Sequence, residues 1–333
     1  MNTTKYPVVN YLLQDAHEKD YSNIILTTEN QYYKKDGGWQ PLQVDEALRL
    51  SLSNELLDIY KIEKNKYSGR KKAYDFSYEL PTTPSKRFRG NISQDMNKIS
   101  AVFRPIQSVI PSLADMYMPS SLYEIMKKKR GLVIVSGPTD SGKSTLLAAL
   151  LDYVNCNASR HIITIEDPIE YIFQSGESII NQYEIGDTLE TFSDGLLAAL
   201  RQAPDIIMVG ELRDRRSIET ALRAAETGHL VLSTIHAGTI PEVADRLKQY
   251  FPGDMQQQIQ QQFANCFQAV IVQQLLPAKS GGRIAAQEIM LRDHATINMI
   301  RTGRYMLETT LRATDGMQTM EDAVEELRVA GLI

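Results

Sequence analysis

Hydrophobic and polar positions in the first hundred residues follow two different periods. Apolar residues recur at helical spacing over 7–19 and 43–61, which predicts a helix in each segment. Apolar and polar residues alternate over 74–80 and 87–93, as they do along half-buried strands. The sequence Asp36-Gly37-Gly38 separates two aromatic-bearing runs, which predicts a hairpin. We therefore expect a small unit of mixed helices and strands in this part of the chain.

The pattern changes after residue 131, where short and wholly apolar runs alternate with helical stretches. These runs lie at 132–135, 162–165, 206–209, 230–232 and 269–272. Runs of this kind are typical of strands buried on both faces of a mostly parallel sheet, with helices as connections. A last helix is predicted to begin near Thr319, which forms a plausible capping pair with Asp322. The expected fold class of this part is α/β.

A segment with no clear hydrophobic period, 104–118, separates the two patterns and contains two prolines. We expect an N-terminal domain at 1–104, a linker or hinge at 105–118 and a second domain at 119–333. Two domains agree with the roughly 100 to 200 residues that a domain commonly contains.

A glycine-rich stretch after the first apolar run carries the strongest chemical signal. Gly137, Gly142, Lys143 and Ser144 satisfy the spacing G-x-x-x-x-G-K-[ST], between an expected strand and an expected helix. In such a loop the backbone N–H groups converge on phosphate oxygens at the positive end of a helix. Lys143 is expected to reach the outer phosphates and Ser144 to bind magnesium. The expected nucleotide-binding residues of the loop are Gly137, Pro138, Thr139, Asp140, Ser141, Gly142, Lys143, Ser144 and Thr145.

Two groups of acidic residues follow predicted strands of the second domain. Glu166 and Asp167 come directly after one apolar run, and Glu211 comes shortly after the next. Because ligands bind outside the carboxyl ends of strands in such sheets, we expect both groups beside the phosphate loop. A carboxylate there can polarise water or organise the shell of a metal ion. The alternative for each is a solvated loop residue or a helix cap, and a cap is the favoured role of Asp214.

Two histidines flank the apolar run at 230–232. Their spacing of seven does not match a helical metal pair. His236 follows Ser233 and Thr234 at the carboxyl end of the expected strand, where a polar side chain can sense a terminal phosphate, so we favour a functional role for it. His229 precedes the strand, and a structural role is as much expected for it as a functional one.

Composition narrows the classes of function. The chain has 333 residues, with 36 basic and 41 acidic side chains and a net charge of −5, which argues against a dedicated nucleic-acid binder. Its two cysteines lie far apart, so they form neither a zinc framework nor a disulfide scaffold, and they fit a reducing cytosol. Apolar runs are too short for a transmembrane helix, and the first residues lack the pattern of a secretory signal.

Four motifs together resemble those of one superfamily. GPTDSGKST at 137–145, TIEDPIE at 164–170, DIIMVGELRD at 205–214 and TGHLVLSTIHA at 227–237 occur in the order found in the secretion ATPases of type II and type IV machines. Within that superfamily the chain resembles the PilT-like twitching-motility ATPases of type IV pili. Asp140 departs from the usual glycine. The zinc site of the pilus extension branch is excluded, because it needs four cysteines.

The resemblance implies the architecture of a ring motor. The subunit would combine a PAS-like N-terminal α+β domain with a RecA-like P-loop ATPase domain, and a homo-hexamer would bind ATP and Mg²⁺. The ring would work in the cytoplasm, at the cytoplasmic face of the inner membrane, through a platform protein of the pilus or secretion machine. It would contact no nucleic acid directly, and the membrane only through its partners.

The resemblance also implies roles for individual residues. Glu211 would activate water, while Glu166, Asp167 and Glu170 would organise magnesium and its waters. The remaining implied residues are the histidine-box pair His229 and His236 and the two N-terminal-domain arginines Arg89 and Arg104, which would reach the γ-phosphate. Arginine suits that role because its planar fork matches phosphate oxygens and stays charged. The alternative for both arginines is an ordinary surface salt bridge.

Pilus retraction is the leading expectation for the work that such a motor performs. The related members of the superfamily leave a conjugative pilus or type IVB secretion as the alternative. A nucleotide-dependent scaffold is a weaker alternative, because Glu166 and Glu211 supply carboxylates that a pure binder does not need. A DNA translocase is weaker still, because the net charge is negative.

Overall fold

The computed structural model describes residues 5–35, 38–66, 73–82, 86–96, 98–106, 109–186 and 189–333. The chain divides into two compact units. The first contains Met1–Val109, Asp167–Ile172 and Glu184–Glu190, and the second contains Ile110–Glu166, Phe173–Tyr183 and Thr191–Ile333. Two short later segments therefore belong to the first unit, a feature that the hydrophobic pattern did not predict.

The first unit is an antiparallel sheet with two helices. Its six strands have the order β3-β2-β1-β6-β5-β4, and every neighbouring pair is antiparallel. The elements are α1 (Pro7–Glu18), β1 (Asn23–Thr27), β2 (Gln31–Lys35), β3 (Gly38–Leu42), α2 (Glu46–Lys66), β4 (Ala73–Leu80), β5 (Lys86–Asp95) and β6 (Lys98–Ile106). This architecture agrees with the expected α+β domain. The expected hairpin is the β2–β3 pair, although residues 36–37 of its turn lie outside the described residues.

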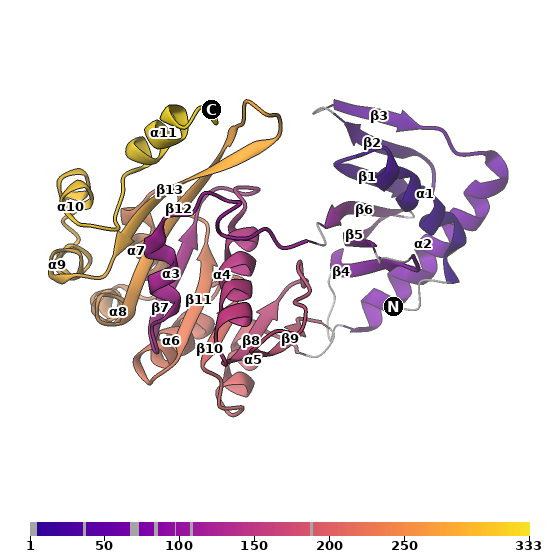
Figure 1. The fold of residues 1–333 in the computed structure, drawn as a ribbon. Helices are drawn as coiled ribbons and strands as arrows, with labels where there is room; N and C mark the ends of the chain where they lie inside the picture. The colour runs from indigo at the N-terminus through magenta and orange to yellow at the C-terminus, as the bar shows by residue number, and fades with distance from the viewer. Residues whose placement is uncertain are drawn as a thin grey trace. The chain divides into compact units, whose positions relative to one another are not determined.

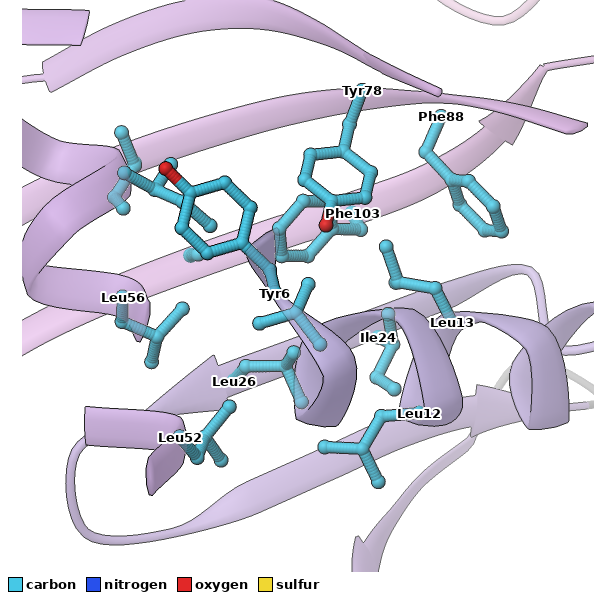
Figure 2. Close-up of a cluster of buried hydrophobic side chains, with 14 of the residues drawn as sticks. Tyr6, Leu12, Leu13, Ile24, Leu26, Leu52, Leu56, Tyr78, Phe88 and Phe103 are labelled. Atoms are coloured by element: carbon cyan, nitrogen blue, oxygen red, sulfur yellow. The ribbon is translucent and has the colours of Figure 1, made fainter. Parts of the chain in front are cut away.

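The core of the first unit lies between the helices and one face of this sheet. Figure 2 shows Leu12 and Leu13 of α1 and Leu52 and Leu56 of α2 together with aromatic side chains from the strands, among them Phe103. Side chains alternate between the two faces of a strand, so every second residue of β5 lies in this core and the residues between them lie on the opposite face. That opposite face is the one that carries the arginines described below.

The second unit is built on a seven-stranded sheet. The strand order is β13-β12-β7-β11-β10-β8-β9, and the neighbours from β12 to β8 run parallel while β12 and β13 run antiparallel. The elements are α3 (Ser120–Met126), β7 (Gly131–Ser136), α4 (Lys143–Asn157), β8 (His161–Glu166), β9 (Ile179–Glu184), α5 (Phe192–Ala199), β10 (Ile206–Val209), α6 (Arg215–Glu226), β11 (Leu230–Ile235), α7 (Ile240–Gln249), α8 (Gly253–Cys266), β12 (Phe267–Pro277), β13 (Arg283–Leu291), α9 (His294–Thr302), α10 (Leu307–Ala313) and α11 (Met320–Val329). The expected α/β sheet wound with helices is confirmed, and Figure 1 shows the helices around it.

Register places the carboxyl ends of the central strands at one edge of the second sheet. Ser136 at the end of β7 pairs with Ile235 at the end of β11, and Ser233 of β11 pairs with Val209 at the end of β10. The strand that carries the phosphate loop is therefore separated from β10 by β11. Every residue of β7, β10 and β11 is buried, which explains why these strands are wholly apolar apart from a few polar residues near their ends.

Two smaller features of the described residues complete the fold. The final helix α11 begins as predicted, because the side chain of Thr319 accepts a hydrogen bond from the backbone N–H of Asp322. Within the described ranges, no helix combines the length and the apolar character needed to cross a bilayer.

Candidate functional site

Three residues with positive φ shape the loop between β7 and α4. Gly137 has φ 143°, Asp140 has φ 61° and Gly142, the N-cap of α4, has φ 82°. A Cβ atom on Gly137 would lie 2.3 Å from the carbonyl oxygen of Gln273, and one on Gly142 would lie 2.9 Å from its side-chain nitrogen. Both loop glycines are therefore required by backbone conformation and by close packing against β12.

The interior of this loop fits an anion. The Nζ atom of Lys143 lies 3.0 Å from the carbonyl oxygen of Gly137 and 2.7 Å from that of Pro138, and the lysine is almost fully buried. The hydroxyl of Ser141 is buried without a hydrogen-bond partner among the described residues. A buried ammonium group, an unsatisfied hydroxyl and a helix N-terminus together match the oxygens of a phosphate chain.

Asp140 takes the conformation that usually calls for glycine. Aspartate tolerates the left-handed region better than most residues, so the loop keeps its shape without glycine at this position. Residue 140 is exposed, and its carbonyl oxygen accepts a hydrogen bond of 3.3 Å from Arg283. The departure from the family pattern thus changes the charge of the loop rather than its backbone.

Removing that charge is expected to strengthen nucleotide binding. Asparagine adopts the left-handed conformation as readily as aspartate, so Asp140→Asn preserves the loop backbone and removes the repulsion between a carboxylate and a phosphate chain. We expect the Kd for ADP to fall about fivefold, the size of a unit-charge interaction in water at contact distance. Titration with a fluorescent ADP analogue at low salt measures it. Asp152→Asn in α4 is the control for an equal change in net charge, and an unchanged Kd for Asp140→Asn would contradict the expectation.

The carboxylate of Glu211 lies between an arginine and a histidine at the carboxyl edge of the second sheet. Its Oε2 atom accepts a hydrogen bond of 2.7 Å from Arg213, and its Oε1 atom lies 3.5 Å from Nε2 of His236. Leu212 is held to β11, because its N–H donates to the carbonyl oxygen of Thr234. Glu211 is the less exposed member of both pairs, so Arg213 and His236 shield a carboxylate that is largely withdrawn from water.

Glu166 lies at the end of β8, next to this pair in the sheet. Its Oε1 atom accepts hydrogen bonds from Thr164 at 2.7 Å and from Gln182 at 3.3 Å, and its side chain is buried. The N–H of Gly210, just before Glu211, donates to the carbonyl oxygen of Ile165. The two carboxylates therefore follow neighbouring strands of the sheet, and different side chains contact them: Thr164 and Gln182 donate to Glu166, and Arg213 donates to Glu211.

A cleft of about 780 Å³ adjoins the phosphate loop. Residues 137–139 and His236 line it on the side of the sheet, and Glu242, Asp245 and Arg246 of α7 line it opposite. The cleft shows that His236 and the start of the loop share one solvent-filled space. Both acidic and basic side chains of α7 therefore face a ligand that enters the cleft.

His229 and Asp214 lie apart from these groups. His229 precedes β11, at the end of the sheet opposite the loop, and the six residues of β11 separate it from His236 by about 20 Å. Its Nδ1 atom lies 3.2 Å from the carbonyl oxygen of Ala224, near the end of α6. Asp214 is the N-cap of α6 and accepts from the N–H of Ser217, which confirms the predicted cap.

Arg89 and Arg104 are directly opposite each other in the first unit. They form one cross-strand pair of β5 and β6, and Nη1 of Arg89 lies 3.4 Å from Oε1 of Glu170 within the same unit. Arg87, two residues before Arg89 on the same strand face, donates to the hydroxyl of Ser77 at 3.1 Å. Like charges directly opposite one another disfavour a sheet unless anions offset them, and Glu170 is one such anion.

No three or more His, Cys, Asp or Glu side chains come together as a possible metal site in the part of the chain that the structure describes. Magnesium bound with a nucleotide commonly uses one or two carboxylates, phosphate oxygens and water. The donors predicted for it are Ser144 in the first turn of α4, Glu166 at the end of β8, and Asp167, which comes directly after β8. Their role as ligands stays a prediction.

Two residues that sequence reasoning missed hold this edge of the sheet together. The buried hydroxyl of Ser136 lies 2.8 Å from the carbonyl oxygen of Ala237 and accepts from the N–H of that residue at 3.1 Å, which joins the end of β7 to the segment after β11. Gln273 of β12 is buried against the phosphate loop. The same sequence feature could have indicated both residues, because each is a polar residue at the end of an otherwise apolar run.

The chain is similar to two proteins of pilus-based motility. The chain is 38% identical to the twitching motility protein of Neisseria gonorrhoeae over 301 residues, which covers 89% of this chain and 80% of that protein. It is 41% identical to the type IV pilus retraction ATPase PilT of Pseudomonas aeruginosa over 262 residues, covering 78% and 76%.

Solved structures with the same fold include two ATPases. The pilus retraction motor PilT with bound ADP matches with a TM-score of 0.82 and 36% identity, covering 98% of this chain and 94% of that one. The Legionella pneumophila ATPase DotB matches with a TM-score of 0.77 and 26% identity, covering 99% and 93%. The family model described as Type II/IV secretion system protein matches residues 114–328. With its RecA-like fold and phosphate loop, the chain belongs to the Type II/IV secretion system protein family.

Proposed function

We propose that this protein is a motor ATPase that hydrolyses ATP, with Mg²⁺, to retract a type IV pilus. The observation that carries the proposal is the meeting of an anion-binding loop and the Glu211–His236 pair at one edge of a parallel sheet. The similarity to PilT proteins supports the direction of the work, since those relatives are named for pilus retraction and twitching motility.

Different side chains of this protein are proposed to bind the phosphates, to activate water and to hold magnesium. Lys143 leaves its two carbonyl partners and neutralises charge on the outer phosphates, while the loop N–H groups hold the phosphate oxygens. Glu211 orients the attacking water and accepts its proton, and His236 is within reach of the same carboxylate. Magnesium, when bound, supplies Lewis-acid stabilisation of the phosphate charge, and Ser144, Glu166 and Asp167 are the proposed donors to it and its waters.

The arginines of the first unit are proposed to contact the terminal phosphate. The direct opposition of Arg89 and Arg104 supports an anionic ligand for that strand face. We also propose that the segment 105–118 is a hinge, so that loss of the terminal phosphate releases the arginines and moves the N-terminal domain, 1–104, against the domain 119–333. His229, at the other end of β11, is not assigned to the subunit's own loop.

The proposed assembly follows from the family resemblance. We propose a homo-hexameric ring in the cytoplasm that acts on an inner-membrane platform protein, and so reaches the membrane only through its partners. Nucleic acid is not a proposed ligand, because the net charge of the chain is −5.

A second candidate is a motor of a conjugative pilus or type IVB secretion system. The match to DotB favours it, because DotB aligns over 99% of this chain. The higher identity and TM-score of PilT place retraction first.

Two measurements test the proposal together. The purified protein is expected to release phosphate from ATP only when Mg²⁺ is present, and chelation by EDTA should stop the release. Deletion of the gene is expected to leave excess pili that do not retract. Unchanged piliation with loss of transfer or secretion would favour the second candidate, and absence of ATP turnover in the wild-type protein would contradict both.

A further inference from the structure

Two side chains of the β12–β13 pair hold consecutive carbonyl groups of the phosphate loop from outside. Nε2 of Gln273 donates to the carbonyl oxygen of Ser141 at 2.6 Å, and Nη1 of Arg283 donates to that of Asp140 at 3.3 Å. Both donors lie more than 130 positions from the loop in the sequence. Neither belongs to the residues assigned above to nucleotide binding.

These contacts determine where the loop N–H groups point. In a trans peptide the C=O and the following N–H point in opposite directions. When the carbonyl of Ser141 faces Gln273, the N–H of Gly142 faces away from β12, into the loop. In the same way the contact of Asp140 with Arg283 directs the N–H of Ser141 inward. Successive N–H groups aimed into one concavity are what a bound phosphate requires.

The orientation of the Gln273 amide is itself fixed. Its side chain is fully buried, and its Oε1 atom accepts a hydrogen bond of 3.3 Å from Nε2 of Gln287 on β13. A reversed amide would present an oxygen to the carbonyl of Ser141 and a nitrogen to another nitrogen. The main chain of Gln287 is held in turn, because its carbonyl oxygen accepts from the Gln318 side chain at 2.7 Å.

We propose that Gln273, oriented by Gln287, is a positioning residue for nucleotide binding, because it fixes the peptide between Ser141 and Gly142 so that its N–H can donate to phosphate. The inference deepens the proposed function and rests on it. Gln273 needs no contact with the nucleotide. It acts by holding a backbone donor in place before the nucleotide arrives, which removes the cost of reorganising the loop on binding.

The variant Gln273→Leu tests whether the hydrogen bond from Gln273 to the phosphate loop matters for nucleotide binding. Gln273→Leu keeps the approximate volume and removes the hydrogen bond, so the carbonyl of Ser141 is free to turn inward. We expect about tenfold weaker binding of ADP, the effect of losing one good hydrogen bond to the phosphate chain. The matched control is Gln268→Leu, because Gln268 lies on the same strand and donates from Nε2 to the carbonyl oxygen of Arg130 at 3.0 Å, away from the loop. The control should bind ADP like wild type.

The variant Gln273→Glu adds a second readout, the pH dependence of ADP binding. A purely structural role of Gln273 would not change that pH dependence. In Gln273→Glu the neutral acid can donate to Ser141, whereas the carboxylate repels both that carbonyl and the phosphates. Burial raises the pKa of such a carboxyl group. ADP affinity relative to wild type should therefore be nearly restored at pH 6 and fall about tenfold or more by pH 8.5.

The outcomes separate the inference from the proposed function. Weaker binding by the leucine variant together with pH-dependent rescue in the glutamate variant supports the inference. Wild-type affinity in both variants overturns it while leaving the proposed function intact. A pH-independent loss in Gln273→Glu also overturns it, even if Gln273→Leu fails to fold. Failure of the wild-type protein to bind ADP overturns the proposed function and this inference together.

Discussion

Lys143→Ala is expected to reduce ATP turnover by the purified protein at least about 100-fold and to weaken ATP binding strongly. The ammonium group of Lys143 donates to two loop carbonyls in a nearly buried position. A buried ammonium group is costly to remove from water, and a bound phosphate chain offsets that cost. Loss of the side chain removes that charge and also leaves the carbonyls of Gly137 and Pro138 without their donor.

The matched control is Lys129→Ala, since Lys129 is exposed just before the other end of β7. It should hydrolyse ATP at the wild-type rate. Turnover is measured as phosphate release, with binding of a fluorescent ATP analogue measured separately. Wild-type turnover by Lys143→Ala in a preparation free of contaminating ATPases would show that the loop is not the site of hydrolysis.

The sheet of the second unit could be predicted because its central strands are buried on both faces. Strands β7, β10 and β11 have no exposed residue, so each is visible in the sequence as a short apolar run. The phosphate loop could be predicted because its chemistry is local: the glycines, the lysine and the helix start all lie within eight residues. The carboxyl-edge position of Glu211 follows from the same strand directions.

Strand direction also carried information that the sequence interpretation did not use. A residue before β11 must lie at the edge opposite the loop, so the position of His229 could have been foreseen from the run at 230–232. The two histidines belong to one sequence motif, but β11 lies between them and places them at opposite ends of the sheet.

Contacts between distant segments could not be predicted, because no local pattern encodes them. Gln273 reaches the loop from a strand more than 130 residues later, and the pairing of Arg89 with Arg104 depends on the register of β5 and β6. A shift of one residue in that register would put the two arginines out of alignment. For the same reason the assignment of Asp167–Ile172 and Glu184–Glu190 to the first unit emerged only from the structure.

Glu211→Gln is expected to separate binding from hydrolysis. Glutamine keeps the size of the side chain and can still accept a hydrogen bond from Arg213, but it is neutral and far too weak a base to take a proton from water. ATP affinity should stay within about threefold of wild type, while turnover falls roughly 100-fold to 10,000-fold, the contribution typical of a positioned general base. Single-turnover phosphate release and equilibrium ATP binding measure the two effects independently.

Two further variants make the assignment of the base specific. Glu219 is a partly exposed residue of α6 that pairs with Arg215 at 2.9 Å, so Glu219→Gln controls for the loss of one carboxylate and should hydrolyse ATP normally. Glu166→Gln alters a carboxylate already held by Thr164 and Gln182, and its main expected effect is a higher Mg²⁺ concentration for half-maximal turnover. If turnover instead survives in Glu211→Gln and is lost in Glu166→Gln at saturating Mg²⁺, then Glu166 is the base. The hydrogen bonds from Thr164 and Gln182 would then serve to aim it.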